Sequence, residues 1–364
     1  MFKVKKKMGL ILVSSIVSLG LLAACGSEES DSSAEGGKMK IEVVAKGFQH
    51  DFWRAVKTGA ENAAEEFDAE IQFVGPKNES AIAEQVEMIN NAINKKPSAI
   101  ALAALDTNAS LDAIQKAMNN EIPIIGFDSG VPDAPEGSVL ANASTDNYAA
   151  GELAAEGMFK GIEEKVASAN GDVIRIGVVA QEVNSLSITA RTEGFVDKMV
   201  ELVEGKVGKG KVAVTGHAKL ENDVKVKGAP VVIETRVPAQ LTDAAGQTEA
   251  QTLLEKSDLI GIYGSNEFAA KAIINADNAI SGGKIGPDKV IAVGFDSGAL
   301  QLDAVKTERF YGSITQDPIS IGYQAVKLAI EAAKGEEVAD VDTGAKWYDA
   351  SNIDSEEIAP LLYE

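Results

Sequence analysis

The chain has 364 residues, a formal net charge of −21 and a single cysteine. Its length is sufficient for two domains of ~100–200 residues each. The acidic balance argues against nucleic acid and anionic lipid as partners, and one cysteine cannot form an intramolecular disulfide or a two-cysteine metal site.

The N-terminal segment has the pattern of a secretory signal. Lysines within residues 3–7 precede an apolar stretch over residues 8–22, which is short for a bilayer span. The sequence Leu22-Ala23-Ala24-Cys25 then resembles a bacterial lipobox. That resemblance implies that residues 1–24 are removed and that Cys25 becomes the lipidated first residue, whose acyl chains would hold the protein on a membrane. The alternative is an uncleaved anchor with a chance cysteine.

Residues 25–38 are expected to form a flexible tether. Residues 27–37 consist of serine, glutamate, aspartate and glycine with almost no apolar side chain. Such a composition cannot bury a core. The folded part therefore begins near Met39.

The first half of the folded part alternates strands and helices. Short apolar runs predict strands, and apolar residues at helical spacing predict helices. In chain order these are strand 41–45, helix 52–66, strand 70–74, helix 82–93, strand 99–103, helix 110–119 and strand 122–127. Such alternation gives βαβ units and a parallel sheet.

The second half repeats this order. The expected elements are helix 148–159, strand 174–179, helix 190–203, strand 231–235, helix 244–254, strand 259–263, helix 268–279, strand 290–295, helix 300–306, strand 310–314 and helix 319–333. The chain is therefore predicted to form two similar α/β lobes.

One stretch interrupts the alternation. Between residues 204 and 230 two short alternating runs, 211–214 and 224–226, flank polar residues. This pattern predicts a β-hairpin inserted into the second lobe. The insertion is either a surface decoration or a docking surface for a partner.

The pentapeptide Gly-Phe-Asp-Ser-Gly occurs twice, at 126–130 and at 294–298, and each copy ends a predicted strand. Open α/β sheets bind ligands outside the carboxyl ends of their strands. Asp128 and Asp296 are therefore predicted to present one carboxylate from each lobe to a ligand. The alternative is that both aspartates only cap turns or helices.

Other polar and aromatic side chains also follow predicted strands. Carboxylates and amides bond hydroxyl groups, arginine offers a fork of donors, and aromatic rings pack on the C–H face of a sugar. This mixture favours a neutral polyhydroxylated ligand. The candidate ligand-binding residues are His50, Phe52, Trp53, Asp128, Arg191, Asn266, Asp296 and Gln316. For several of them a core, capping or surface role remains the alternative.

Catalysis is not indicated by any motif. The sequence has no G-x-S-x-G elbow, no H-E-x-x-H pair and no glycine-rich phosphate loop, and it has only two histidines. We expect no enzymatic activity, no catalytic residue, no bound metal and no cofactor.

Taken together, the motifs resemble those of the sugar-binding receptors of bacterial ABC importers, the ribose- and galactose-type periplasmic binding proteins. The resemblance runs from about Met39 to the C-terminus, apart from the insertion. Its marks are Gly126-Phe127-Asp128, Ala143 to Asn147, Arg191 to Phe195, Gly264 to Glu267, Val293 to Asp296, and Gln316. In that family the ligand contacts fall on positions that match the eight candidate residues.

The resemblance implies the type I fold, which has two Rossmann-like lobes with parallel sheets joined by a three-segment hinge. Crossovers are expected near 145–146, 316–317 and 346–350. Lobe one would then comprise residues 39–145 and 317–347, and lobe two residues 146–316 and 348–364.

The implied function is that of a monomeric, lipid-anchored receptor on the extracytoplasmic face of the cell membrane. It would capture a monosaccharide or cyclic polyol between its lobes and deliver it to the permease subunits of an ABC transporter. A chemosensory or quorum-signal receptor on the same scaffold is the alternative. Gene repressors share the fold, but a signal peptide stands where their DNA-reading helices would be.

Three departures from the ribose-type pattern leave the sugar open. Ser129 follows Asp128 where such receptors commonly have arginine. His50-Asp51 precedes the paired aromatics where asparagine is frequent. An aromatic expected in the second lobe falls near Leu241.

Overall fold

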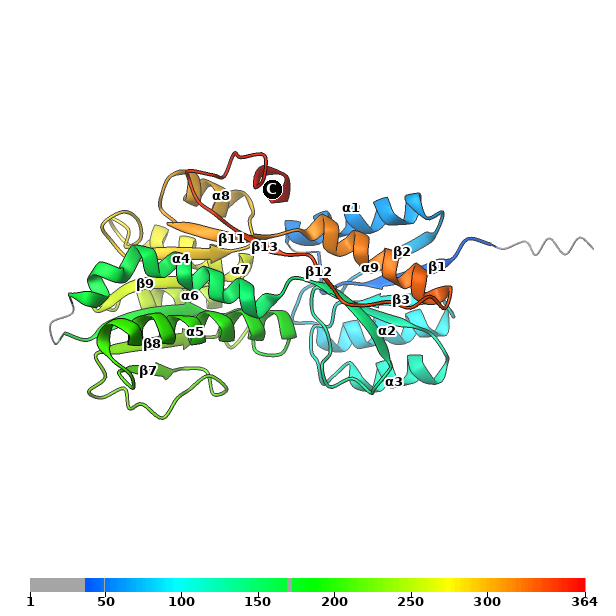
Figure 1. Cartoon of the computed structure of the whole chain (residues 1–364), viewed down its shortest axis with the longest axis horizontal. Coiled ribbons are helices and arrows are strands. Elements are labelled where there is room, and N and C mark those ends of the chain that lie inside the picture. The colour runs from blue at the N-terminus through cyan, green and yellow to red at the C-terminus, as the bar shows by residue number, and fades with distance from the viewer. Residues whose placement is uncertain (1–36, 49, 169–171, 364) are drawn as a thin grey trace, which may run out of the picture. The chain divides into compact units, whose positions relative to one another are not determined.

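The computed structural model describes residues 37–48, 50–168 and 172–363. The expected signal (1–24), the lipidation site Cys25 and the tether as far as residue 36 lie outside the described residues. Residues 38–364 form one compact unit, which contains two α/β lobes, each with its own sheet (Figure 1).

Lobe one is built on a six-stranded sheet in the order β12-β5-β4-β3-β1-β2, with every neighbouring pair parallel. Its elements are β1 (Lys40–Val44), α1 (Asp51–Glu66), β2 (Glu70–Val74), α2 (Ile82–Asn94), β3 (Ala99–Leu102), α3 (Leu111–Asn119), β4 (Ile124–Phe127), β5 (Val139–Ser144), α9 (Pro318–Ala333) and β12 (Val341–Asp342). All four residues of β3 are buried, as expected for a strand covered on both faces.

Lobe two is built on a seven-stranded sheet in the order β13-β11-β10-β9-β6-β8-β7. Only β13 runs antiparallel to its neighbour β11. The elements are α4 (Asn147–Ala167), β6 (Ile174–Val179), α5 (Leu186–Val207), β7 (Val212–Thr215), β8 (Val231–Arg236), α6 (Asp243–Leu254), β9 (Leu259–Gly264), α7 (Glu267–Ala279), β10 (Ile291–Phe295), α8 (Ala299–Lys306), β11 (Gly312–Gln316), β13 (Ala345–Tyr348) and the 3₁₀ turn η1 (Ala359–Leu361).

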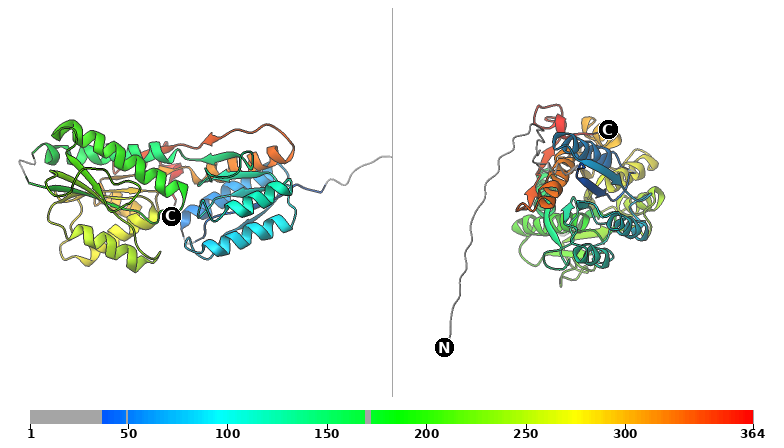
Figure 2. Two further views of the ribbon diagram at one scale, coloured as in Figure 1. Left: turned by 90° about the horizontal axis from the view of Figure 1, so that it is seen from below. Right: turned by 90° about the vertical axis from the view of Figure 1, so that its right-hand side faces the viewer.

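Helices cover both faces of each sheet (Figure 2, left). In lobe one, α1 and α9 share one buried core, and α2 and α3 share the other. In lobe two, α4 and α5 cover one face, and α6, α7 and α8 cover the opposite face. Figure 1 shows α1 and α9 side by side, although they come from opposite ends of the sequence. The expected two-lobed α/β fold is thereby confirmed.

Glycines let paired helices approach each other closely. A Cβ on Gly59 of α1 would lie 1.9 Å from the backbone oxygen of Ile319 in α9. In lobe two, a Cβ on Gly151 of α4 would lie 2.1 Å from the backbone oxygen of Arg191 in α5. Larger side chains would push these helices apart, because cores are close-packed. The second contact sets the distance between α4 and the part of α5 that carries Arg191.

The chain passes between the sheets at residues 145–146, at residue 317 and at residues 343–344. The third crossover therefore lies earlier than the expected position near 346–350. The reason is that β13 begins at Ala345 and pairs with β11, so residues 345–347 belong to lobe two and not to lobe one.

The β-hairpin expected within residues 204–230 is not formed, and this prediction is wrong. α5 continues to Val207, and β7 pairs in parallel with β8 at the edge of the sheet. The Asn222 side chain bonds the backbone of β7 through Val214 N (3.2 Å) and Val212 O (3.0 Å). An asparagine side chain thus forms hydrogen bonds with the backbone at the outer edge of β7, where the sequence pattern predicted a second strand.

Candidate functional site

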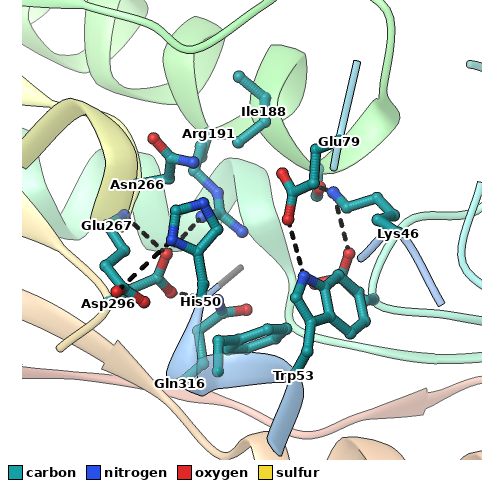
Figure 3. A pocket seen from close by; sticks show the side chains of 13 residues that line it. Lys46, His50, Trp53, Glu79, Ile188, Arg191, Asn266, Glu267, Asp296 and Gln316 are labelled. Carbon is teal, nitrogen blue, oxygen red and sulfur yellow. Dashed lines mark hydrogen bonds and ion pairs between the residues drawn. The ribbon is translucent and has the colours of Figure 1, made fainter. Parts of the chain in front are cut away.

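The carboxyl ends of both sheets meet at one cleft with about 340 Å³ of empty space, part of which is open to solvent. Figure 3 shows the side chains that line it. The cleft brings together all of the residues that the sequence singled out: His50, Phe52, Trp53, Asp128, Arg191, Asn266, Asp296 and Gln316. Their direct contact with a ligand stays a prediction.

Both aspartates of the repeated pentapeptide have left-handed backbone conformations, with φ 55° at Asp128 and φ 73° at Asp296. Aspartate is one of the few residues other than glycine that tolerates this region. Each backbone N–H also bonds the neighbouring strand, Asp128 N to Ala143 O and Asp296 N to Ile314 O. The repeat therefore encodes the same sharp turn twice, and each turn aims a carboxylate at the cleft.

Asp296 lies in a dense set of donors. Its Oδ1 accepts a hydrogen bond from Gln316 Nε2 at 2.6 Å, and its Oδ2 accepts one from the Glu267 backbone N–H at 3.2 Å. Arg191 Nη1 lies 3.6 Å from Oδ2. Burial raises the pKa of Asp296 above its ordinary value, and the Arg191 charge reduces that shift.

Arg191 is held rigidly, with 2% of its surface exposed. Its Nε and Nη2 both donate to Asn147 Oδ1, at 3.1 and 2.6 Å, and Nη1 donates to Ser265 O at 3.3 Å. The guanidinium also lies 3.8 Å from the centre of the Phe295 ring. The predicted helix 190–203 includes Arg191, but α5 begins four residues earlier, at Leu186.

Lys46 is a cleft residue that sequence reasoning missed. It lies two residues after the end of β1, is 5% exposed, and places Nζ 3.2 Å from Asp128 Oδ2. The same Nζ donates to Ser187 Oγ of lobe two at 3.1 Å. Burial alone would lower the pKa of Lys46, but the Asp128 and Glu79 carboxylates raise it overall. Its position immediately after a predicted strand, like that of Asp128, was the available signal.

Glu79 and Glu267 are two further cleft residues that the sequence analysis did not select. Glu79 Oε1 accepts from Trp53 Nε1 at 2.7 Å. Glu267 Oε1 lies 3.5 Å from His50 Nδ1 across the cleft. Burial raises the pKa of Glu267. Burial alone would also raise the pKa of Glu79, but the His50 and Lys46 charges lower it overall. Glu267 directly follows the selected Asn266 after the predicted strand 259–263 but was not chosen, whereas Glu79 lies five residues beyond the predicted strand 70–74.

Two residues of interest lie outside this cleft. Ser129 is buried beside it, and its Oγ accepts from the Ser187 N–H at 3.3 Å. Leu241 lines a second cleft formed by other loops. Lys46 and Ser187 line the cleft near Asp128, and Ser129 is not among the residues that line it.

Two buried acceptors in the cleft lack a hydrogen-bond donor among the described residues. They are Glu267 Oε2 and Gln316 Oε1. Leaving a buried polar group unsatisfied costs ~1–3 kcal/mol. A ligand that brings hydroxyl donors to these atoms would remove that cost.

Within the described ranges, no helix is long and apolar enough to cross a membrane. Among those same residues, no group of three or more histidine, cysteine, aspartate or glutamate side chains is placed to hold a metal ion.

Residues 41–337 match the model of the periplasmic binding protein domain, so the chain belongs to that family. This match confirms the family membership that the motifs indicated.

Curated relatives match over different lengths. The "Ribose import binding protein RbsB" of Haemophilus influenzae is 24% identical over 90% of this chain and 94% of its own. The "Fructose import binding protein FruE" of Bifidobacterium longum is 28% identical, but that match spans 46% of this chain and about half, 51%, of the relative.

Solved structures match over almost the whole folded part. A Brachyspira murdochii protein described as an ABC transporter of the LacI transcriptional-regulator family is 39% identical, with a TM-score of 0.75 over 90% of this chain and 99% of that one. A solute-binding protein from Agrobacterium vitis with bound D-fucose is 29% identical, with a TM-score of 0.74 over 89% of this chain and 100% of that one.

Proposed function

We propose that this protein captures a monosaccharide or cyclic polyol between its two lobes and delivers it to the permease of an ABC transporter. The observation that carries the proposal is the pair of carboxylates, Asp128 and Asp296, set on matching left-handed turns at opposite sides of one cleft. The sugar-bound relative and the ribose import relative support it.

The cleft offers both partners that a hydroxyl group needs. Asp128 and Asp296 accept hydrogen bonds from hydroxyls, while Lys46 and Arg191 can donate to hydroxyl or ring oxygens. Charge-assisted bonds of this kind are roughly twice as strong as neutral ones. Phe52 supplies an aromatic surface in the same cleft, suited to the C–H face of a sugar ring.

We further propose that the receptor works on the extracytoplasmic face of the membrane, anchored through lipidated Cys25. The signal-like segment and the lipobox-like Leu22-Ala23-Ala24-Cys25 support this part. Membership of a periplasmic binding protein family fits the same location. Mass spectrometry of the mature membrane-bound protein is expected to find an acylated N-terminal Cys25, and a mature protein that starts elsewhere would contradict it.

A thermal-shift screen tests the binding function. The mature protein is melted with a panel of pentoses, hexoses and cyclic polyols, and each hit is titrated by calorimetry. A ligand at 100 times its Kd stabilises the fold by ~2.7 kcal/mol, which is easily seen as a rise in Tm. Recovery of the ligand unchanged after prolonged incubation distinguishes a receptor from an enzyme. A panel without any hit would contradict the proposal.

A further inference from the structure

A continuous chain of hydrogen bonds closes one side of the cleft. Trp53 Nε1 donates to Glu79 Oε1 at 2.7 Å, and Gln181 Nε2 donates to Glu79 Oε2 at 2.5 Å. Asn266 Nδ2 then donates to Gln181 Oε1. All four side chains are buried, with exposed fractions of 1% for Trp53, 7% for Glu79, 2% for Gln181 and 6% for Asn266.

The bond between Glu79 and Gln181 is the link that joins the two lobes. Glu79 follows β2 in lobe one, and Gln181 follows β6 in lobe two. The chain's ends are fixed within each lobe, because Trp53 is packed in the lobe-one core and Asn266 Oδ1 accepts from Ala269 N at the start of α7. Both ends of the Gln181 amide are engaged, since its nitrogen donates to Glu79 and its oxygen accepts from Asn266.

The sheet orders place this link on the side of the cleft away from the crossovers. The crossovers leave from β5, β11 and β12, at or next to one edge of each sheet. Glu79 follows β2, which is the opposite edge of its sheet, and Gln181 follows β6, which β10 and β9 separate from β11. Beyond the link lies a second, open cleft of about 1070 Å³, whose walls include both Glu79 and Gln181. We call this second cleft the vestibule; Ile82 and Leu105 line it from lobe one, and Gln240 and Leu241 from lobe two.

We propose that Glu79 and Gln181 form a latch that limits the ligand to a single ring. The latch separates the small inner cleft from the vestibule, so a substituent on a bound sugar would have to break a buried, charge-assisted hydrogen bond. This assignment rests on the proposed sugar-binding function and adds the residues that set the length of the ligand. The vestibule is large enough for a second ring once the latch is removed.

The test compares the sugar that binds tightest in the screen with its mono-O-benzyl derivatives, one for each hydroxyl group. Wild-type protein is expected to bind every derivative at least 100-fold more weakly than the free sugar. In Gln181→Ala, the derivative whose benzyl group points at the latch is expected to bind with a Kd within about 10-fold of that of the free sugar. Affinities are measured by calorimetry.

A matched control is Gln240→Ala, which makes the same change at an exposed vestibule residue outside the latch. This variant is expected to keep the wild-type ratio between the Kd of each derivative and the Kd of the free sugar. Gln181→Ser serves as a second latch variant if the alanine variant folds poorly.

The outcomes separate the two proposals. Absence of binding by any free sugar would count against the proposed function itself. Two results would overturn the latch while leaving the proposed function intact. In one, the free sugar binds but neither latch variant binds any derivative more tightly than wild type does. In the other, wild type binds a derivative as tightly as the free sugar.

Discussion

The two repeated aspartates share a backbone conformation but have different neighbours. Asp128 faces the Lys46 ammonium at 3.2 Å, whereas Asp296 accepts from Gln316 and from the Glu267 N–H and faces Arg191 at 3.6 Å. Two similar turns therefore place carboxylates with different neighbours in the same cleft. Asp296 is the better target for substitution, because its role can be separated from that of a turn residue.

Asp296→Asn is expected to weaken ligand binding by ~2–3 kcal/mol, or about 30- to 150-fold in Kd. Asparagine tolerates the left-handed φ of 73°, so the turn survives. It replaces one acceptor oxygen by an NH₂ group and removes the charge opposite Arg191. Calorimetric titration measures the affinity, and the melting curve of the ligand-free variant is the control. Wild-type affinity in the variant would mean that Asp296 is only a turn residue.

Site residues could be predicted where the local sequence itself carried a signal. Asp128 and Asp296 were predictable because the same five residues ended two apolar runs. Glu79 was not, because its role depends on Trp53 and on Gln181, which is 102 residues away in sequence. Lys46 pairs with Asp128 from another strand. Pairings between distant residues leave no periodic signal in one sequence.

At the scale of elements, the close pair α4 and α5 decides where Arg191 lies. A Cβ at Gly151 would approach the Arg191 backbone oxygen to 2.1 Å and the Phe195 nitrogen to 2.9 Å. A Cβ at Gly205 of α5 would meet nothing within 4 Å. These two glycines therefore have opposite expected effects when replaced by alanine.

Gly151→Ala is expected to lower the free energy of unfolding by ~1–3 kcal/mol, because overpacking forces the helices apart. It should also weaken ligand binding, since Arg191 moves with α5. Gly205→Ala, the matched control, should be neutral or stabilising by ~0.5–1 kcal/mol through helix propensity. Urea unfolding and calorimetry check both variants. Equal stability of the two variants would mean that α4 and α5 can separate without cost.

The C-terminal segment joins elements of both lobes. Tyr363 exchanges hydrogen bonds with Ser297, which follows Asp296, through its backbone N at 3.1 Å and its backbone O at 3.3 Å. Its ring lies 6.0 Å from the ring of Phe52, a cleft residue of α1. Figure 2 shows the C-terminal end between the two lobes.

Tyr363→Ala is expected to weaken ligand binding by about 10-fold, mainly through faster dissociation. The physical reason is the loss of an aromatic contact, worth ~0.5–1.5 kcal/mol, that supports Phe52. Tyr363→Phe keeps the ring and should retain most of the affinity. Stopped-flow fluorescence measures the dissociation rate. If the alanine variant releases ligand at the wild-type rate, the segment does not support the cleft.

Element boundaries show where sequence patterns were insufficient. β5 was not predicted because its sequence, VLANAS, is only weakly apolar and its burial is mixed. The runs 211–214 and 224–226 looked alike, yet only the first forms a strand, and Val226 is exposed. Buried central strands carry a strong apolar signal. Edge strands depend on which neighbour the rest of the fold supplies.

For the whole molecule, pH is expected to act through the His50–Glu267 pair, which links the lobes. Burial alone would lower the pKa of His50, but the Glu267 carboxylate raises it above 6.5 overall. A raised histidine pKa contributes stability that is present below the unfolded value of ~6.5 and is lost as pH rises through the folded value. Burial raises the pKa of Glu267, so the pair also weakens in acid.

The Tm difference between wild type and His50→Gln should therefore be largest near pH ~6 and should shrink towards pH ~9 and pH ~4. Differential scanning fluorimetry across this range measures it, and taking the difference cancels the titration of the other groups. A Tm difference that is constant with pH would show that His50 carries no charge in the folded protein.

Several direct contacts between the lobes indicate that the structure is the closed state. Lys46 Nζ donates to Ser187 Oγ at 3.1 Å, and Thr107 N donates to Asn184 O at 3.3 Å. The latch bond between Glu79 and Gln181 adds a third contact. The lobes are joined by short crossovers at 145–146, 317 and 343–344, which are the positions where a hinge can absorb backbone rotation.

We therefore expect the ligand-free protein to populate an open state and the ligand to favour the closed one, because only the closed cleft lets Asp128 and Asp296 bind the same molecule. Small-angle X-ray scattering of the mature protein should give a smaller radius of gyration with saturating sugar than without it. Asp296→Asn at the same sugar concentration is the matched control, and its weaker binding should leave it with a larger mean radius of gyration than the wild type. An unchanged radius in saturated wild-type protein would contradict closure on the ligand. If that radius equals the one calculated from the closed structure, the contacts between the lobes, rather than the sugar, hold the cleft shut.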